Sequence, residues 1–202
     1  MKIALIGVTG RVGSRLATEL LSRGHTVTGI ALHAPPDGRS GIRILEADAT
    51  KLDSLAPCLA GHDAVISASR FVTSNADTLI AVVKRAGVKR LLVVGGAGSL
   101  EVAPGKALLS TAGFPEAFKA EATAGAQFLD RLRAEPDLDW TFLSPSADFA
   151  PGERTGKFRL GHDRLLTDAA GKSHISMEDF AIAMVDELER PAHSRQRFTV
   201  GY

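Results

Sequence analysis

Three glycines near the start of the chain have the spacing of a phosphate-binding turn. Gly7, Gly10 and Gly13 follow the apolar run 3–6 and open a segment with helical periodicity. In such a strand–turn–helix unit, the first glycine permits the tight turn, the second lets the backbone approach a pyrophosphate, and the third lets the helix pack closely on the strand. The helix N-terminus also offers free N–H groups and a positive dipole end to the anion. The sequence therefore predicts a dinucleotide-binding site that begins at residue 7.

The same turn contains Thr9, Arg11 and Val12, which we expect to contact the dinucleotide together with the three glycines. The spacing is G-x-x-G-x-x-G rather than the commoner G-x-G-x-x-G. A glycine motif alone is weak evidence, and a tight turn with no ligand is the alternative. The position of this motif between an apolar strand and an amphipathic helix favours the binding site.

The end of the second predicted strand, residues 26–32, bears on which dinucleotide binds. An NAD-selective site has an acidic residue there, which holds the ribose 2′-hydroxyl. Here the next residue is His33, so no acid stands at this strand end to repel a 2′-phosphate. Arg11, His33 and Arg39 could approach that phosphate, and an arginine can bind it through two hydrogen bonds. We therefore expect NADP, with NAD the lesser choice; the alternative is that His33 and Arg39 are solvated loop residues.

Two further strand ends are expected to border the dinucleotide. Asp48 and Ala49 follow the third predicted strand, where a carboxylate can accept a hydrogen bond from the exocyclic amine of adenine. Ala68 and Ser69 come at the end of the fourth, beside the point at which ligands bind in an open α/β sheet, and their small size lets the backbone approach the cofactor. A turn or helix-capping aspartate and an ordinary β–α turn are the respective alternatives.

Strands and helices alternate along most of the chain. We expect strands at 2–6, 26–32, 42–46, 64–68, 90–94, 140–143 and 197–200, and helices at about 12–21, 51–59, 73–86, 118–132 and 177–188, the last with Ser176 as N-cap. Residues 100–115 are expected to form a long loop, and 157–160 and 164–167 a hairpin. This pattern predicts a Rossmann-like, doubly wound parallel sheet in a three-layer α/β/α arrangement. We expect one NAD(P)-binding domain over 1–202, with a small C-terminal elaboration on the substrate side from about 145 to 202.

Composition disfavours several classes of partner. The net charge of +1 over 202 residues gives no reason to expect a nucleic acid or an anionic membrane surface. No apolar run approaches the roughly 20 residues of a membrane span. The single cysteine, Cys58, cannot form an internal disulfide, the histidines lack the paired spacing of a metal site, and no signal peptide precedes the first strand. We expect a cytoplasmic protein without a metal, acting on a small-molecule acceptor as a monomer or homodimer.

The glycine turn, Asp48 and the small residues after the fourth strand resemble an atypical short-chain dehydrogenase/reductase. Within that superfamily the chain is most similar to the small NAD(P)H-binding proteins called NADH-flavin reductases, which are related to biliverdin reductase B and the NmrA-like proteins. The stretches that carry this resemblance are 93–100, 140–145, 151–157, 175–181 and 197–202. The resemblance implies an NAD(P)H-dependent oxidoreductase, with a flavin such as FMN or FAD, a quinone or a similar conjugated molecule as its substrate.

The chain departs from the superfamily at the catalytic residues. Typical members use Tyr-x-x-x-Lys, in which the tyrosine donates a proton and the lysine holds the nicotinamide ribose. Lys119 fits the lysine position, but Pro115 stands four residues earlier, and Tyr202 is the only tyrosine. The superfamily's serine position holds a glycine, Gly95 or its neighbour, and Ser99 lies slightly further on. The resemblance implies ribose binding by Lys119 and a hydrogen bond from Ser99 to cofactor or substrate; the alternatives are a solvated lysine and a loop serine.

The strand ends nearest the expected nicotinamide position carry Gly95 on one strand and Pro145 and Ser146 on the next, which we expect to border the ring. Without the tyrosine, the expected acceptor is one that needs little acid help, because a conjugated ring requires stacking and orientation while protons come from water. The incomplete catalytic pair leaves a second hypothesis open. In it the protein is a non-catalytic NADP(H)-sensing regulator of the NmrA-like type.

Overall fold

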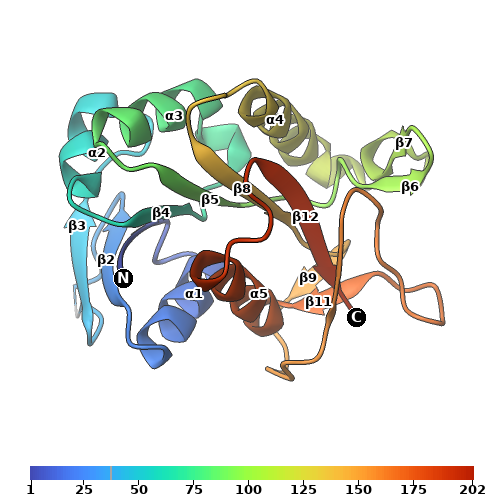
Figure 1. The fold of residues 1–202 in the computed structure, drawn as a ribbon. Helices are drawn as coiled ribbons and strands as arrows, with labels where there is room; N and C mark the ends of the chain where they lie inside the picture. The colour runs from blue at the N-terminus through green and yellow to red at the C-terminus, as the bar shows by residue number, and fades with distance from the viewer. Residues whose placement is uncertain (37) are drawn as a thin grey trace.

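An eight-stranded sheet forms the middle layer of the molecule (Figure 1). Its strands are β1 (Lys2–Ile6), β2 (Thr26–Ala31), β3 (Ile42–Glu46), β4 (Ala64–Ser67), β5 (Arg90–Val94), β8 (Asp139–Ser144), β10 (Arg159–Gly161) and β12 (Gln196–Gly201). They lie in the order β10-β12-β8-β5-β4-β1-β2-β3, and the pairings are parallel except that of β10 with β12. The computed structural model describes residues 1–36 and 38–202; Asp37, in the loop predicted after the second strand, lies outside them.

Five helices in the described residues cover the sheet on its two faces (Figure 1). They are α1 (Arg11–Ser22), α2 (Leu52–Leu59), α3 (Ala76–Arg85), α4 (Glu116–Arg133) and α5 (Met177–Glu189). Leu16 of α1 and Phe180 of α5 pack on one face with Ile3, whereas Phe128 of α4 packs on the other with Ala4. Successive residues of a strand point to opposite faces, so a strand buried on both sides is apolar throughout. The predicted three-layer Rossmann-like fold is confirmed.

The chain winds outward from the centre of the sheet in two directions. From β1 it moves through β2 to β3 at one edge, and then returns to β4 and continues through β5, β8 and β12. The strand order therefore reverses between β1 and β4, and the crevice beyond their carboxyl ends is where this fold binds ligands. The sequence motifs at residues 7–13 and 68–69 both lie at this crevice.

Two helix starts are fixed by side-chain caps. Ser176 accepts a hydrogen bond from the Asp179 amide at 3.0 Å, which confirms the predicted start of α5. The Asn75 side chain accepts one from the Thr78 amide at 3.1 Å, so α3 begins after Asn75 rather than at residue 73 as predicted. Residues Phe71–Thr73 instead form a short 3-10 helix, η1.

The prediction of an irregular loop over 100–115 is wrong for its first half. β6 (Glu101–Ala103) and β7 (Lys106–Ala107) form a small antiparallel hairpin, and the 3-10 helix η2 (Leu108–Ser110) follows it. Gly105, with φ of 70°, supplies the left-handed residue of the turn. The two strands are too short to show an alternating pattern in the sequence, so the sequence did not reveal this hairpin.

The hairpin predicted at 157–160 and 164–167 is also wrong. β10 pairs with the C-terminal strand β12, and Arg164 makes only an isolated bridge to Glu101. A further two-stranded parallel pair, β9 (Asp148–Ala150) with β11 (His174–Ser176), joins segments far apart in the chain. A pattern of alternating residues indicates an extended segment but does not identify its partner, which here comes from a distant part of the sequence.

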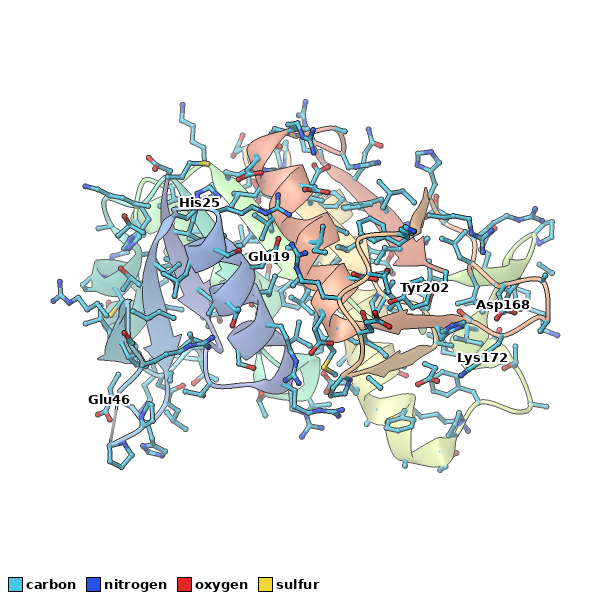
Figure 2. The ribbon with its side chains drawn as sticks, turned by 90° about the horizontal axis from the view of Figure 1, so that it is seen from below. Glu19, His25, Glu46, Asp168, Lys172 and Tyr202 are labelled. Atoms are coloured by element: carbon cyan, nitrogen blue, oxygen red, sulfur yellow. The ribbon has the colours of Figure 1, made fainter. Side chains whose placement is uncertain are left out.

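A buried carboxylate joins α1, α5 and the segment 151–157. Glu19 is 4% exposed, and Figure 2 shows it on the side of α1 that meets α5. It accepts hydrogen bonds from Arg23 at 2.8 Å and from two nitrogens of Arg154 at 3.0 Å. Burial raises the pKa of the Glu19 carboxyl, but the hydrogen bonds from Arg154 and Arg23 outweigh it and hold that pKa below its usual value.

The substitution Glu19→Gln should therefore lower the free energy of unfolding near neutral pH and make it less sensitive to a decrease in pH. A carboxyl whose pKa is lower in the folded state stabilises the fold above its unfolded pKa and loses that contribution as the pH falls through the folded pKa. We expect a loss of about 1–3 kcal/mol near neutral pH, since hydrogen bonds to charged groups are removed. Urea unfolding over the acid range should also show a shallower fall in stability than in the wild type.

The control for this experiment is Asp53→Asn. Asp53 pairs with Arg85 at 2.7 Å, but its side chain is 88% exposed, so its replacement should change stability by less than about 1 kcal/mol. If the stability of Glu19→Gln fell with decreasing pH as steeply as that of the wild type, the lowered pKa of Glu19 would not contribute to the acid dependence of folding.

Candidate functional site

The glycine turn leaves no room for side chains at its first and third positions. Gly7 has φ of 79°, and a Cβ on it would lie 2.8 Å from the carbonyl oxygen of Ala68. A Cβ on Gly13 would lie 2.0 Å from the carbonyl oxygen of Gly7. Real contacts of this kind do not occur, so α1 can pack this closely on β1 only with glycine at both positions.

The start of α1 presents unused hydrogen-bond donors. Gly10 is the N-cap of the helix and provides no side chain to cap it. Within the described residues, no acceptor lies within hydrogen-bond range of the amides of Arg11, Val12 and Gly13. Free amides at the positive end of a helix are suited to a phosphate group. The turn therefore fits the pyrophosphate of a dinucleotide, which is the group that the sequence predicts there.

A cavity of about 480 Å³, the glycine-turn groove, extends from this turn along the carboxyl ends of β1 to β4. Predicted residues that line it are Gly7, Thr9, Gly10, Asp48, Ala49, Ala68 and Ser69. It is also lined by Leu32, Thr50, Arg70 and Thr73, which the sequence did not single out. Arg11, Val12, Gly13 and His33 do not line it, although the first three form the opening turn of α1 beside it.

Asp48 is held in place by its own turn. Its Oδ1 accepts hydrogen bonds from the hydroxyl of Thr50 at 2.6 Å and from the amide of Thr50 at 2.9 Å, and Lys51 Nζ lies 3.5 Å from Oδ2. The hydrogen bonds from Thr50, side chain first and backbone second, lower the pKa of Asp48 below its usual value. An ionised, oriented carboxylate is an acceptor for an exocyclic amine, but its bonds to Thr50 alone also explain a turn aspartate.

The loop after β2 has an acidic residue beside it, which the sequence did not predict. His33 is exposed, and Arg39 donates to the carbonyl of Ser14 at 2.8 Å on the flank of α1. Glu46, the last residue of β3, accepts a hydrogen bond from the amide of Ala34 at 2.8 Å, and Figure 2 shows it at the outer edge of the sheet. A carboxylate therefore does stand beside this loop, contributed by the neighbouring strand. The adjacency of β2 and β3 in this fold was the signal that could have revealed it.

A second cavity, here called the apolar cavity, has a volume of about 390 Å³ and lies at the carboxyl ends of β5 and β8. Gly95, Pro145 and Ser146, which the sequence predicts beside a nicotinamide ring, line it, and the aromatic rings around it are Phe71, Phe114, Phe118 and Phe149. A Cβ on Gly95 would lie 2.7 Å from the carbonyl oxygen of Leu143, which explains the glycine at this position. η1 contributes Phe71 to this cavity and Thr73 to the glycine-turn groove, so the two are neighbours.

The two residues predicted to be catalytic do not line either cavity. Lys119 is half-exposed, and its Nζ lies 2.6 Å from Glu116 one turn away. The hydroxyl of Ser99 faces Arg197, whose Nη1 is 3.4 Å away, behind the glycines that line the apolar cavity. Phe118, not Lys119, presents its side chain to the cavity from the first turn of α4. The spacing of Phe118 and Ala122, four residues apart on one face of the helix, was the signal for this, because both line the cavity.

The only tyrosine of the chain lies away from the apolar cavity. Its hydroxyl donates to Asp179 Oδ2 at 2.7 Å and lies 2.9 Å from Ser176 Oγ, in a separate cavity of about 320 Å³ beside β9 and β11. Burial, aided by the Asp179 carboxylate, raises the pKa of Tyr202 above its usual value. Tyr202 therefore is not placed to donate a proton in the apolar cavity.

Two structural findings limit the classes of site. In residues 1–36 and 38–202, no group of three or more His, Cys, Asp or Glu side chains is arranged to hold a metal ion. No helix in the described part of the chain has the length and apolar character that crossing a membrane requires.

The fold and the glycine turn define a Rossmann-type dinucleotide-binding protein. Comparison with family models gives the same class, because residues 7–191 match the NAD(P)H-binding family. The chain belongs to this NAD(P)H-binding family. The uncharacterized protein YwnB of Bacillus subtilis (strain 168) is 40% identical over 210 residues, which cover 99% of this chain and 98% of YwnB.

Three solved structures are similar over the whole chain. A putative exported protein from Burkholderia pseudomallei is 47% identical with a TM-score of 0.92, and each chain is covered completely. A putative epimerase from Bacteroides thetaiotaomicron is 45% identical with a TM-score of 0.93, covering 100% of this chain and 96% of that one. A putative NADH-flavin reductase from Streptococcus pneumoniae TIGR4 is 38% identical with a TM-score of 0.85, covering 100% and 99%. The second of these proteins is named as an epimerase and the third as a flavin reductase, so the similarity does not identify one reaction for this chain.

Proposed function

We propose that this protein is an NAD(P)H-dependent reductase of a flavin, a quinone or a similar conjugated acceptor. The observation that supports this most directly is the apolar cavity beside the glycine-turn groove. Its phenylalanine rings suit a flat conjugated molecule, because aromatic rings pack favourably when offset or edge to face. In the described lining, no lysine, histidine or tyrosine is available to protonate an alkoxide, so reduction of an ordinary ketone is disfavoured.

The residues of the glycine-turn groove and of the apolar cavity have separate tasks in this proposal. The free amides at the start of α1 bind the pyrophosphate, Asp48 accepts from the adenine amine, and Gly95 and Pro145 border the nicotinamide. When bound, NAD(P)H supplies two electrons and one proton to the acceptor, which takes a second proton from water. The protein's own contribution is orientation and exclusion of water, since its cavity walls are largely apolar.

We propose NADPH as the preferred dinucleotide, because Arg11 opens α1 and Arg39, from the loop after β2, donates a hydrogen bond to the flank of α1. Glu46 beside the same loop opposes this preference. Parallel titrations with NADPH and NADH decide between them. NADH binding about tenfold tighter, which corresponds to about 1.4 kcal/mol, would reverse the proposal.

The reductase proposal is tested by NADPH oxidation with naphthoquinone, riboflavin, FMN, FAD and biliverdin as acceptors. We expect turnover with at least one of them above the rate without protein. The expected rate should fall with Gly10→Asp, which is designed to block the glycine turn. Absence of turnover with every acceptor would contradict the proposal.

The placement of Lys119 and Ser99 outside both cavities supports a second candidate, a non-catalytic NADP(H)-sensing regulator. This candidate predicts NADP(H) binding without turnover, and a partner protein whose affinity changes with the redox state of the dinucleotide. Pull-downs in the presence of NADP⁺ and of NADPH distinguish the two, since a reductase requires no such partner. A monomer or homodimer in the cytoplasm stays a prediction for either candidate.

A further inference from the structure

The one charged residue in the described lining of the apolar cavity is already used by the backbone. Glu121 Oε1 accepts a hydrogen bond from the Phe71 amide at 2.7 Å, and Oε2 accepts one from the Val72 amide at 3.2 Å. Arg70 Nε lies 3.7 Å from the same carboxylate. The carboxylate thus fixes η1 against α4, and its negative charge at the cavity wall repels an anion.

The two hydroxyl side chains of the lining are used as well. Ser146 donates to the carbonyl of Val200 at 3.0 Å, and Thr111 donates to the carbonyl of Leu108 at 2.8 Å. With their hydrogens engaged, these oxygens can only accept further hydrogen bonds. The lack of side-chain donors costs an uncharged ring or carbonyl group of the acceptor little binding energy. An anionic group that leaves water needs hydrogen-bond donors, and these side chains provide none.

The cations next in sequence to the lining residues Phe71 and Phe118 are paired. Arg70 faces Glu121 of the lining, and Lys119 faces Glu116 at 2.6 Å. A phosphate or sulfonate would have to compete with a carboxylate for each of them. These two pairs, which include Glu121, therefore carry no net positive charge that would attract an anion.

From these contacts we infer that the apolar cavity selects uncharged, planar conjugated acceptors and discriminates against acceptors with an anionic group on or near the ring. This inference rests on the proposed reductase function and specifies its substrate class. Unsubstituted quinones and unphosphorylated isoalloxazines belong to that class, whereas ring sulfonates do not. Reduction of a quinone to its hydroquinone consumes one hydride from the dinucleotide and one proton from water, so the balance requires no charged side chain in the cavity.

The test compares naphthoquinone with its ring-sulfonated derivative, which differ in one anionic group. Binding of each to the protein saturated with NADP⁺ is measured by calorimetry. We expect naphthoquinone to bind at least about tenfold more tightly than the sulfonate, and riboflavin to bind at least as tightly as FMN. Equal binding of the two quinones, tighter binding of the sulfonate, or no binding of either would overturn the inference.

A pair of variants tests whether charge causes the discrimination. Phe118 lines the cavity from the first turn of α4 and is 64% exposed, so it can be replaced with little cost to folding. Phe118→Lys places a cation at the cavity, and should bind the sulfonate about tenfold more tightly than the matched control Phe118→Leu does. Equal affinities of the two variants for the sulfonate would show that charge is not the cause.

Steady-state NADPH oxidation with the same two quinones separates this inference from the proposed function. If naphthoquinone binds selectively but is not reduced, the reductase proposal fails and the selectivity stands. If both quinones are reduced with equal kcat/KM, the reductase proposal stands and the selectivity fails. The proposed function and the proposed selectivity are therefore contradicted by different results.

Discussion

The variant Gly10→Asp should bind NADPH about 100-fold more weakly than the wild type and remain folded. Gly10 is the N-cap of α1 with φ of −72° and ψ of 168°, a backbone conformation that aspartate adopts readily, and an added Cβ would make a tight contact of 3.2 Å with the carbonyl oxygen of Gly7, which a small shift relieves. Aspartate is a preferred N-cap residue, because its carboxylate accepts hydrogen bonds from the first amides of the helix. Those amides are the donors that we assign to the pyrophosphate. The substitution therefore removes the donors and adds a negative charge, and 100-fold corresponds to about 2.7 kcal/mol.

Gly10→Asn is the matched control for this variant. Asparagine has the size and capping ability of aspartate without its charge, so it should weaken NADPH binding by only about tenfold. Calorimetric titration measures the affinities, and thermal unfolding should give a Tm equal to or slightly above that of the wild type for both. Wild-type affinity in the Gly10→Asp variant would show that the dinucleotide does not bind at the start of α1.

The fold and the glycine-turn groove could be predicted because their information is local or periodic. Residues 7–13 form a strand–turn–helix unit whose steric requirements at Gly7 and Gly13 can be stated from the sequence and are met in the structure. Alternating strands and helices predict a doubly wound parallel sheet, and the observed strand order is of this kind. Residues at strand ends, such as Ala68 and Pro145, are then brought to the same edge of the sheet.

The side chains of the predicted catalytic pair could not be placed in this way. Lys119 was located by its distance from a tyrosine position that this chain lacks, and the rotation of α4 instead presents Phe118 to the cavity. Ser99 lies where the chain leaves β5 for the β6–β7 hairpin, and the buried Arg197 of β12 holds its hydroxyl away from the cavity. A contact between residues so far apart in the chain depends on strand partners that no local pattern encodes.

The largest loss of stability is expected for Glu187→Ala. Glu187 lies on α5, its side chain is 3% exposed, and its Oε1 accepts a hydrogen bond from Arg90 Nη2 at 3.0 Å. It also accepts from the ring of His193 at 2.8 Å and from the amide of His193 at 2.9 Å. Arg90 is itself 9% exposed on β5 and also pairs with Asp139 Oδ1 at 3.1 Å, so the alanine variant would leave the buried guanidinium with one carboxylate instead of two.

Breaking a buried ion pair by removing one partner costs about 3–5 kcal/mol. In a chain of this size we expect a decrease in Tm of about 2–4 °C for each kcal/mol, measured by calorimetry or circular dichroism. Glu187→Gln, which keeps a carbonyl acceptor for the same donors, should lose only about 1–3 kcal/mol. A loss below about 1 kcal/mol for Glu187→Ala would contradict the description of this carboxylate as a buried partner of Arg90.

A double variant, Arg90→Met with Glu187→Leu, identifies the origin of the loss even if Glu187→Ala does not accumulate in folded form. Apolar residues of similar volume can replace a buried ion pair with little loss, because neither charge is then left unpaired. Some loss should persist, since the amides of Ala192 and His193 also donate to Glu187. Greater stability of the double variant than of Glu187→Ala would assign the main cost to the buried guanidinium that has lost the Glu187 carboxylate and retains only Asp139. Equal or lower stability would assign it to the two amides that depend on the carboxylate.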